Sequence, residues 1–332
     1  MRKPVGRFND NYLSKDTTNI VKGFFIALIF MSHIQGYIQN SGYSYDAFGD
    51  QTMRGIQHFI GQLVVAMFLF YSGYGIMESY KKKGSAYVAT MPRKRLAGTL
   101  INFDVAVVAF IMVNLLLGIP MSVKQCALSL IAWESVGNSN WYIFVILSLY
   151  LIIFISLMVM CKAGVHRTLY SVAVFIFVSL IVYAILVRFK SSWWYDTFFC
   201  FSAGIIFSLF KKKIQSYLDR YYWMFLIISI FLFFSTKFVP FSFMGVRQNI
   251  NAIMFCFMIV IITRKINLKS MPLKWMGERL FPLYIYQRIP MLMIYHINSG
   301  DFVANHVIYY VSICAVITFV IAYTYKYFSI SI

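Results

Sequence analysis

Long apolar segments recur along the whole chain and alternate with short polar or basic stretches. A helix needs about 20 mainly apolar residues to cross the hydrocarbon core of a bilayer, and most of these segments approach that length. Within them the apolar residues are continuous rather than alternating with polar ones, which favours transmembrane helices over the strands of a membrane barrel. We therefore predict an all-α polytopic membrane protein. Its roughly ten transmembrane helices are predicted at residues 20–38, 58–77, 98–119, 141–161, 168–187, 196–210, 221–236, 248–263, 280–297 and 305–328.

Three apolar segments differ from the others in length. Segments 196–210 and 221–236 are short for a full crossing, so we expect tilted or incomplete spans there. Segment 123–133 is too short to cross, and we expect it to lie at the membrane interface or to re-enter the membrane. No polar loop is long enough to form a soluble domain, so residues 1–332 are predicted to form a single membrane-embedded domain.

The composition agrees with a membrane location. Hydrophobic residues make up 60% of the chain and charged residues 12%, which is about half the charged fraction of an ordinary soluble protein. The cysteines are scattered without paired spacing, which predicts packed thiols rather than a disulfide framework or a metal site. They are Cys126, Cys161, Cys200, Cys256 and Cys314.

The net charge of +19 is distributed as a topology signal. If the N-terminus is cytoplasmic, 23 of the 30 Lys and Arg residues fall in inner segments and 6 in outer loops, as the positive-inside rule requires. We therefore predict that both termini are cytoplasmic, with residues 1–18 as a tail, and we do not expect nucleic acid as a partner. The first apolar run is longer than the hydrophobic region of a signal peptide, so we expect it to remain as a span.

The first apolar helix carries the clearest candidate for chemistry. Lys22 and His33 are the only charged or imidazole side chains between residues 19 and 37. They are nearly three helical turns apart, so both lie on almost the same face, with an axial offset of about 16 Å. Ionisable groups inside a membrane usually face the bundle interior and have a function. We predict that both line a reaction channel. The alternatives are a structural histidine and a lysine that anchors the helix at the membrane surface.

Two charged residues lie within later spans. Asp104 and Arg288 are about 9 Å and 12 Å from the inner ends of their helices. Because their depths are similar and their charges opposite, we predict an ion pair that joins the third and ninth predicted spans.

Several stretches resemble the acyltransferase 3 family, whose members are bacterial multi-spanning enzymes that O-acylate surface glycans. Lys22 followed by His33 resembles the first-helix motif of this family, in which Arg is common at the first position. Residues 68–75, Phe-Leu-Phe-Tyr-Ser-Gly-Tyr-Gly, are similar to its second-helix motif. The basic residues within 81–83 and 92–96 look like its inner loop.

Two later stretches add to the resemblance. Residues 277–287, Gly-Glu-Arg-Leu-Phe-Pro-Leu-Tyr-Ile-Tyr-Gln, resemble a late helix of the family. Gln287 stands where the family commonly has a histidine, so a second acid–base histidine is not expected at that position. Residues 137–144 look like the Trp-led start of a middle span.

The resemblance implies that His33 is the catalytic base, that acetyl-CoA is the acyl donor and that no metal is involved. The residues expected to bind the donor are Lys22, Ser72, Gly73, Tyr74, Arg93, Lys94, Arg95 and Arg288. Some of these residues have a simpler alternative role. The basic run 93–95 is also typical of an anchor for anionic lipids. A glycine such as Gly73 more commonly serves close helix packing.

The acceptor is expected to bind on the outer side. The residues predicted to contact it are Glu134, Asn140, Trp141 and Tyr142, together with the neighbouring Trp133, Asn138 and residues 193–194. Aromatic rings stack on sugars, but an interfacial aromatic belt explains the tryptophans equally well. His58 is expected to be an ordinary loop histidine.

The resemblance therefore implies an O-acetyltransferase of the bacterial cytoplasmic membrane. It is expected to move an acetyl group from cytoplasmic acetyl-CoA to a hydroxyl of a capsular, exo- or other cell-envelope polysaccharide at the outer face. The expected partners are the lipid bilayer and a polysaccharide or lipid-linked glycan. A homo-oligomer and an association with glycan-assembly machinery are left open. The alternatives are a glycan transporter or flippase, for which more intramembrane charge is expected, and a polysaccharide polymerase, for which a large Arg-rich outer loop is expected.

Overall fold

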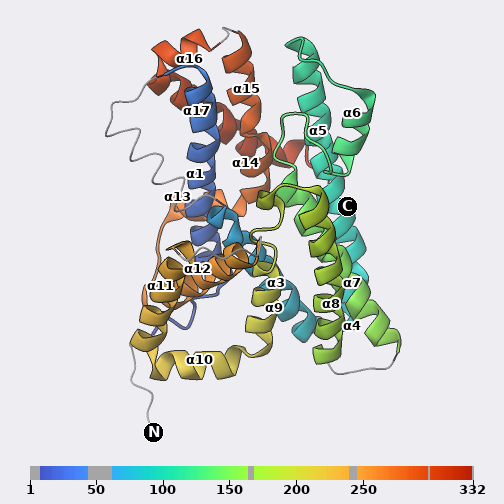
Figure 1. Cartoon of the computed structure of the whole chain (residues 1–332), viewed down its shortest axis with the longest axis vertical. Coiled ribbons are helices and arrows are strands. Elements are labelled where there is room, and N and C mark those ends of the chain that lie inside the picture. Colours follow the sequence, from blue (N-terminus) through green and yellow to red (C-terminus); the bar gives the residue numbers. More distant parts are fainter. Residues whose placement is uncertain (1–7, 44–61, 164–167, 239–244, 298–299, 331–332) are drawn as a thin grey trace.

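The protein is a bundle of helices (Figure 1). The computed structural model describes residues 8–43, 62–163, 168–238, 245–297 and 300–330. Every regular element within these residues is helical, and one set of buried apolar side chains extends from Tyr12 to Ala322. The α-helices are α1 Lys15–Asn40, α3 Leu63–Lys83, α4 Ser85–Met91, α5 Gly98–Leu116, α6 Val123–Leu130, α7 Trp141–Lys162, α8 Thr168–Phe189, α9 Cys200–Leu209, α10 Lys211–Arg220, α11 Tyr222–Phe238, α12 Val246–Lys265, α13 Met271–Glu278, α14 Leu280–Tyr286, α15 Arg288–Ile297, α16 Asp301–Asn305 and α17 Val307–Thr324. A π-helix, η1 Pro92–Ala97, and two 3-10 turns, η2 Ser192–Trp194 and η3 Tyr325–Tyr327, complete the described elements.

Seven helices in the described part of the chain are long and apolar enough to cross a membrane, and there are eight if α10 and α11 form one bent span. These two helices meet at 101°, and α10 lies across one end of the bundle, opposite α16 (Figure 1). Each of the ten predicted spans contains a helix, but α9 has only 10 residues, too few to cross alone. The span predicted at 280–297 is divided at Gln287 into α14 and α15. The all-α polytopic fold is confirmed.

Two prolines explain the breaks around α14. A proline has no N–H to bond to the carbonyl four residues earlier, and its ring disfavours a regular helix there. Pro282 removes the helical partner of the Glu278 carbonyl, and α13 ends at that residue. Pro290 does the same to the carbonyl of Tyr286, where α14 ends. Residues 271–297 therefore form three short helices rather than one rod.

The position of α1 is fixed by a close crossing with α13. Gly23 of α1 faces the backbone of Leu273, and Gly277 of α13 faces the backbone of Asn19. A Cβ atom at either glycine would overlap those backbone atoms. The two helices approach this closely because both positions lack a side chain, as in other small-residue helix contacts. This crossing sets where α1 holds His33.

A second crossing of the same kind joins α3 to α9. Gly73 of α3 faces the carbonyl of Phe201, and Gly204 of α9 faces the carbonyl of Phe70. The contact is reciprocal, so a side chain at either glycine would push both helices apart. Although α9 is short, this crossing anchors it against α3.

The loop 131–140 between α6 and α7 packs into the bundle. The side-chain amide of Asn140 donates to the Ala132 carbonyl at 2.9 Å, and that of Asn114 in α5 donates to the Val136 carbonyl at 2.7 Å. These bonds satisfy loop carbonyls that would otherwise be buried without partners. Segment 123–133, which was expected to lie at the membrane interface or to re-enter the membrane, thus ends in a loop that packs inside the protein.

The N-terminal segment is fastened to α12 by a buried arginine. The Arg264 side chain is 3% exposed. Its Nε and Nη2 atoms donate to the Asp219 carboxylate, both at 2.9 Å. Its Nη1 atom donates to Asp10 at 2.9 Å and to the Asn9 carbonyl at 2.7 Å. One guanidinium therefore joins α10, α12 and the residues that precede α1.

Replacing Asp219 with alanine is expected to lower the free energy of unfolding by about 1.5–3 kcal/mol, because Arg264 loses its bidentate partner while it remains buried. The measurement is unfolding of the purified protein in mixed detergent. Asp10→Ala is the matched control: Asp10 is 82% exposed, so its loss is expected to cost less than about 1 kcal/mol. Equal losses in the two variants would contradict this account of the cluster.

Candidate active site

His33 lies within the bundle near α14. Its Nδ1 atom is buried and makes no hydrogen bond to any described residue. The ring centroids of His33 and Tyr284 are 6.4 Å apart. The hydroxyl of Tyr284 is also buried and has no partner among the described residues. Because most buried polar groups are paired, two unpaired groups beside each other need a specific explanation, and a role in chemistry is one.

Two further polar residues join this pair. The guanidinium of Arg288, the first residue of α15, interacts electrostatically with both His33 and Tyr284. Its Nε atom is buried and unpaired within the described part of the chain. Ser139, in the loop before α7, lies beside Tyr284. We call these four residues the polar chamber. It brings together an imidazole, a guanidinium and two hydroxyl groups from α1, α14, α15 and the loop before α7.

The predicted ion pair between Asp104 and Arg288 is wrong. Neither residue takes part in an ion pair within the described residues. The Oδ1 atom of Asp104 is buried without a partner there, and the charge of Arg288 acts on His33 and Tyr284. The similar depths of the two residues were not enough to predict an ion pair, because pairing also requires both helices to turn these side chains towards each other.

A line of hydroxyl-bearing residues connects the polar chamber to Lys22. The ring of Tyr142 is 5.4 Å from that of Tyr284, between centroids. Ser72 of α3 interacts with Tyr142. One residue earlier, the ring of Tyr71 lies 5.9 Å from the Nζ atom of Lys22. The sequence assigned Ser72 to the donor and Tyr142 to the acceptor, and the structure brings them together.

At the Lys22 end of this line there is a second cation. Arg95 lies in the π-helix η1, with its guanidinium 5.9 Å from the ring centroid of Tyr150. Its charge acts on Lys22, and neither cation has an acidic partner among the residues described. We call Lys22 and Arg95 the inner cation pair. Two nearby cations repel unless an anion joins them, so their arrangement suits a phosphate group. Single π-helical turns are rare and are frequent at functional sites.

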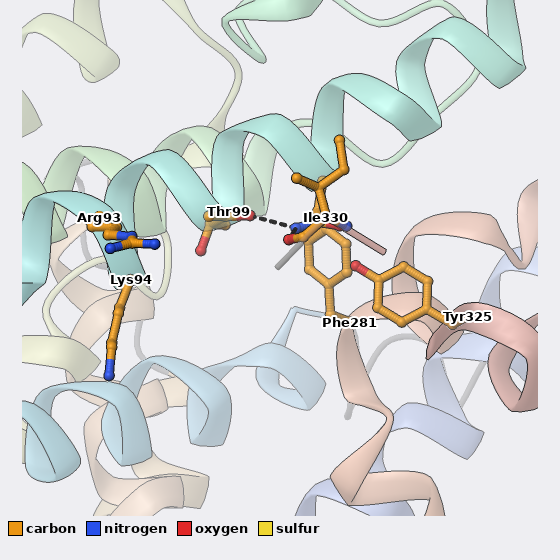
Figure 2. A pocket seen from close by; sticks show the side chains of 8 residues that line it. Arg93, Lys94, Thr99, Phe281, Tyr325 and Ile330 are labelled. Carbon is orange, nitrogen blue, oxygen red and sulfur yellow. Dashed lines mark hydrogen bonds between the residues drawn. The ribbon is translucent and has the colours of Figure 1, made fainter. Parts of the chain in front are cut away.

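Arg93 and Lys94 belong to a different place. They line a cavity of about 350 Å³, which we call the basic pocket. Figure 2 shows Arg93 and Lys94 on one side of this pocket and the rings of Phe281 and Tyr325 on the other. The remaining lining residues are Gly98, Thr99, Asn102 and Ile330. The basic run 93–95 is thus divided between two sites.

The other donor-binding predictions on α3 have contacts within the protein. Gly73 packs against the backbone of Phe201, which is the helix-packing alternative. The Tyr74 hydroxyl accepts a hydrogen bond from the Nζ atom of Lys211 at 2.7 Å. These contacts join α3 to α9 and α10, and only Ser72 of the three predicted residues borders the line to the polar chamber.

The tryptophans predicted to contact the acceptor surround a lysine. The Nζ atom of Lys190 is 3.9 Å from the ring centroid of Trp133 and 4.5 Å from that of Trp194. It donates to the Trp133 carbonyl at 2.7 Å and lies 3.4 Å from the Glu134 carboxylate. The protein's own ammonium group therefore covers part of the ring surface that was predicted to stack on sugars.

The remaining acceptor predictions lie at the start of α7. The side-chain amide of Asn140 holds the Ala132 carbonyl. The Trp141 ring contacts that of Tyr142, with centroids 6.1 Å apart. Of the four predicted residues, only Tyr142 reaches the polar chamber, through Tyr284. His58 lies outside the described residues.

Sequence reasoning missed Tyr284 and Ser139 as site residues. Both lie in stretches that carry the family resemblance, 277–287 and 137–144, and this was the available signal. The hydropathy pattern gave no signal for these two residues, because a tyrosine or a serine within an apolar segment is an ordinary packed residue in most helices. Among the described residues, no group of three or more His, Cys, Asp or Glu side chains is arranged to hold a metal ion.

Comparison with known proteins agrees with the family resemblance. The acyltransferase domain of the Acyl_transf_3 family matches residues 17–326. The chain therefore belongs to the acyltransferase 3 family and is a multi-pass membrane acyltransferase. No curated protein and no solved structure matches it.

Proposed function

We propose that the protein is an O-acetyltransferase of the bacterial cytoplasmic membrane, which moves an acetyl group from cytoplasmic acetyl-CoA to a hydroxyl of a capsular, exo- or other cell-envelope polysaccharide. Family membership supports acyl transfer. The more specific proposal, that the donor is acetyl-CoA and that transfer occurs at His33, is supported by the line of polar residues from the inner cation pair to the polar chamber. It joins a phosphate-compatible charge pattern to an imidazole inside the bundle.

The donor has a natural orientation along this line. The inner cation pair binds the diphosphate of acetyl-CoA, since two cations without an acidic partner in the described part of the chain favour a group with several anionic oxygens. The pantetheine arm then passes Ser72 and Tyr142 towards His33. The axial interval of about 16 Å between Lys22 and His33 is comparable with the length of an extended pantetheine arm. The acetyl thioester reaches the polar chamber while the nucleotide stays at the inner surface.

The polar chamber supplies the groups that acyl transfer needs. The acceptor hydroxyl oxygen attacks the thioester carbonyl carbon while His33 takes the hydroxyl proton as general base. Arg288 and the Tyr284 hydroxyl donate hydrogen bonds to the carbonyl oxygen as it becomes negative. When the carbon–sulfur bond breaks, the thiolate of CoA takes the proton from His33. The products are the acetylated acceptor and free CoA, and the imidazole is neutral again.

The acceptor in this proposal is a polysaccharide or a lipid-linked glycan at the outer face. It approaches the polar chamber from the side of Ser139, away from the donor path along Ser72 and Tyr142. The bilayer is the other partner, and a homo-oligomer or a glycan-assembly complex is compatible with the same chemistry. Membership of the acyltransferase family favours this enzyme over a flippase or a polymerase.

Cells that lack the protein are expected to lose O-acetyl groups from their polysaccharide while polymer length and export stay normal. Proton NMR of the purified polysaccharide measures the acetyl signals, and size-exclusion chromatography measures length and yield. The wild-type copy restored in the same cells is the control. Retained acetyl signals in the deleted cells would contradict acetyl transfer to this polymer, and failed export or short chains would favour the transporter or the polymerase.

A further inference from the structure

We propose that a cavity between α1, α14 and α17 binds a neutral membrane lipid that has a single hydrocarbon chain and a hydroxyl as its headgroup. We call this cavity the membrane pocket. Its volume is about 260 Å³, and its lining comes from α1, α13, α14, α17 and Gln287, the residue between α14 and α15. The inference goes beyond the proposed function, because such a lipid is neither the acyl donor nor the glycan.

The membrane pocket opens towards the hydrocarbon of the bilayer. Met31 of α1 and Phe319 of α17 line it, and they are 46% and 40% exposed. Both belong to segments that are long and apolar enough to cross a membrane, and both lie about 12 Å or more along the helix from its nearer end. Ile26 and Leu283, which also line the pocket, are buried. A ligand therefore enters from the lipid phase rather than from water, so its body is apolar.

The walls of the membrane pocket suit a hydrocarbon chain. None of the described residues that line it is charged, and Gln287 and Thr318 are the two with polar side chains. A charged headgroup would lose its hydration there without gaining a partner, which excludes the headgroups of phospholipids. The volume exceeds the about 150 Å³ of an engineered apolar cavity that binds benzene, so several methylene groups fit inside.

Gln287 gives the membrane pocket an unpaired polar atom. Its side chain is fully buried, and its Nε2 atom donates to the Tyr284 carbonyl at 3.1 Å. Its Oε1 atom has no hydrogen-bond partner among the described residues. An amide oxygen inside a membrane protein costs free energy unless it accepts a hydrogen bond, because the surrounding hydrocarbon offers no donor. A lipid that enters the pocket with an O–H group satisfies this atom.

A hydroxyl fits Gln287 better than an ester or an amide group does. The Thr318 hydroxyl donates to the Cys314 carbonyl at 2.7 Å, and the Gln287 amide nitrogen donates to Tyr284. Both polar side chains of the pocket thus already donate to the backbone, while the atom that lacks a partner is an acceptor. An ester or amide would bring a carbonyl that needs a donor, whereas a hydroxyl can donate to Oε1 and needs only this acceptor.

The membrane pocket is adjacent to the polar chamber but separate from it. Gln287 directly precedes Arg288, and it is bonded to the backbone of Tyr284. Phe30, which lines the pocket, lies nearly one helical turn before His33 in α1. The four residues of the polar chamber are not among the residues that line the pocket. An occupant therefore contacts the helices that hold the chamber without entering it.

The test is photolabelling of the full chain in phosphatidylcholine nanodiscs with a dodecanol that carries a diazirine in its chain. Mass spectrometry of the digested protein locates the label, which is expected on residues 26–31 and 311–319. Unlabelled dodecanol and its methyl ether, which keeps the chain but lacks the donor, are then compared as competitors at equal mole fraction. The alcohol is expected to compete about three- to tenfold more effectively, which is the factor that one neutral hydrogen bond supplies.

Three variants place the effect in the membrane pocket. Gln287→Met is expected to remove the preference for the alcohol, because a thioether is only a weak acceptor. Ala315→Phe is expected to lower the labelling about tenfold or more, since a ring on this lining residue displaces two or more methylene groups of the chain. Val316→Phe is the matched control: the next residue of α17 is 61% exposed and is not among the lining residues, so labelling is expected to match the wild type.

Equal competition by the alcohol and its ether would overturn the proposal, because Gln287 would then gain nothing from the hydroxyl. A label spread evenly over the lipid-facing helices, or one that a folded Ala315→Phe protein keeps at the wild-type level, would overturn it as well. The comparison of the two competitors uses the wild-type protein alone, so it decides the question even where a variant fails to fold.

Discussion

His33→Ala is expected to lower the rate of acyl transfer by about 10²- to 10⁴-fold while the protein still reaches the membrane. The reason is that His33 is the only imidazole in the polar chamber, and loss of a general base usually costs a factor of this size. His33→Gln is expected to lose as much, since an amide keeps a similar shape but cannot accept the proton. The measurement is transfer of labelled acetyl from acetyl-CoA to polysaccharide in membrane vesicles, normalised to the amount of protein.

His296→Ala is the matched control for this prediction. His296 is exposed on α15, and its Nδ1 atom lies 3.1 Å from the Leu292 carbonyl of its own helix. Its replacement is expected to leave the transfer rate close to that of the wild type. If His33→Gln also kept the wild-type rate, His33 would be a structural residue and the proposed mechanism would be wrong.

Gly73→Ala is expected to destabilise the protein by about 1–3 kcal/mol or more, because the new methyl group meets the backbone of Phe201 and forces α3 and α9 apart. Backbone atoms cannot move aside as a flexible side chain can. The expected result is a lower unfolding temperature in detergent and less protein in the membrane. The measurement is a thermal melt followed by loss of the monodisperse peak in size-exclusion chromatography.

Gly75→Ala provides a control two residues away in the same helix. No atom outside the helix lies within 4 Å of a Cβ built at Gly75, so the substitution is expected to be neutral or to stabilise the helix by up to about 1 kcal/mol. Comparing Gly73→Ala with Gly75→Ala also distinguishes two roles for Gly73, helix packing and close approach of the donor. A Gly73→Ala protein that melts like the wild type but has a raised KM for acetyl-CoA would favour approach of the donor to this glycine over helix packing.

The hydropathy pattern and the motifs were sufficient to predict the class of protein. Continuous apolar segments can be stable in only a few ways, because every backbone polar group inside a bilayer must be bonded within the protein. All ten predicted spans therefore contain helices, and the matched family agrees with the motif around Lys22 and His33. His33 was identifiable because an imidazole within an apolar segment is too costly to be common.

Which side chains contact one another could be read only from the packing of the helices. Residue spacing gives the depth of a group and its face on its own helix, but not which neighbour that face meets. Asp104 and Arg288 therefore did not pair, although their depths agree, and Tyr284 became a neighbour of His33 without any signal in its own polarity. The division of residues 93–95 between two sites depends on a π-helical turn and on aromatic residues far along the chain. Such contacts depend on how the helices cross, and here the crossings are set by glycines whose partners lie on other helices.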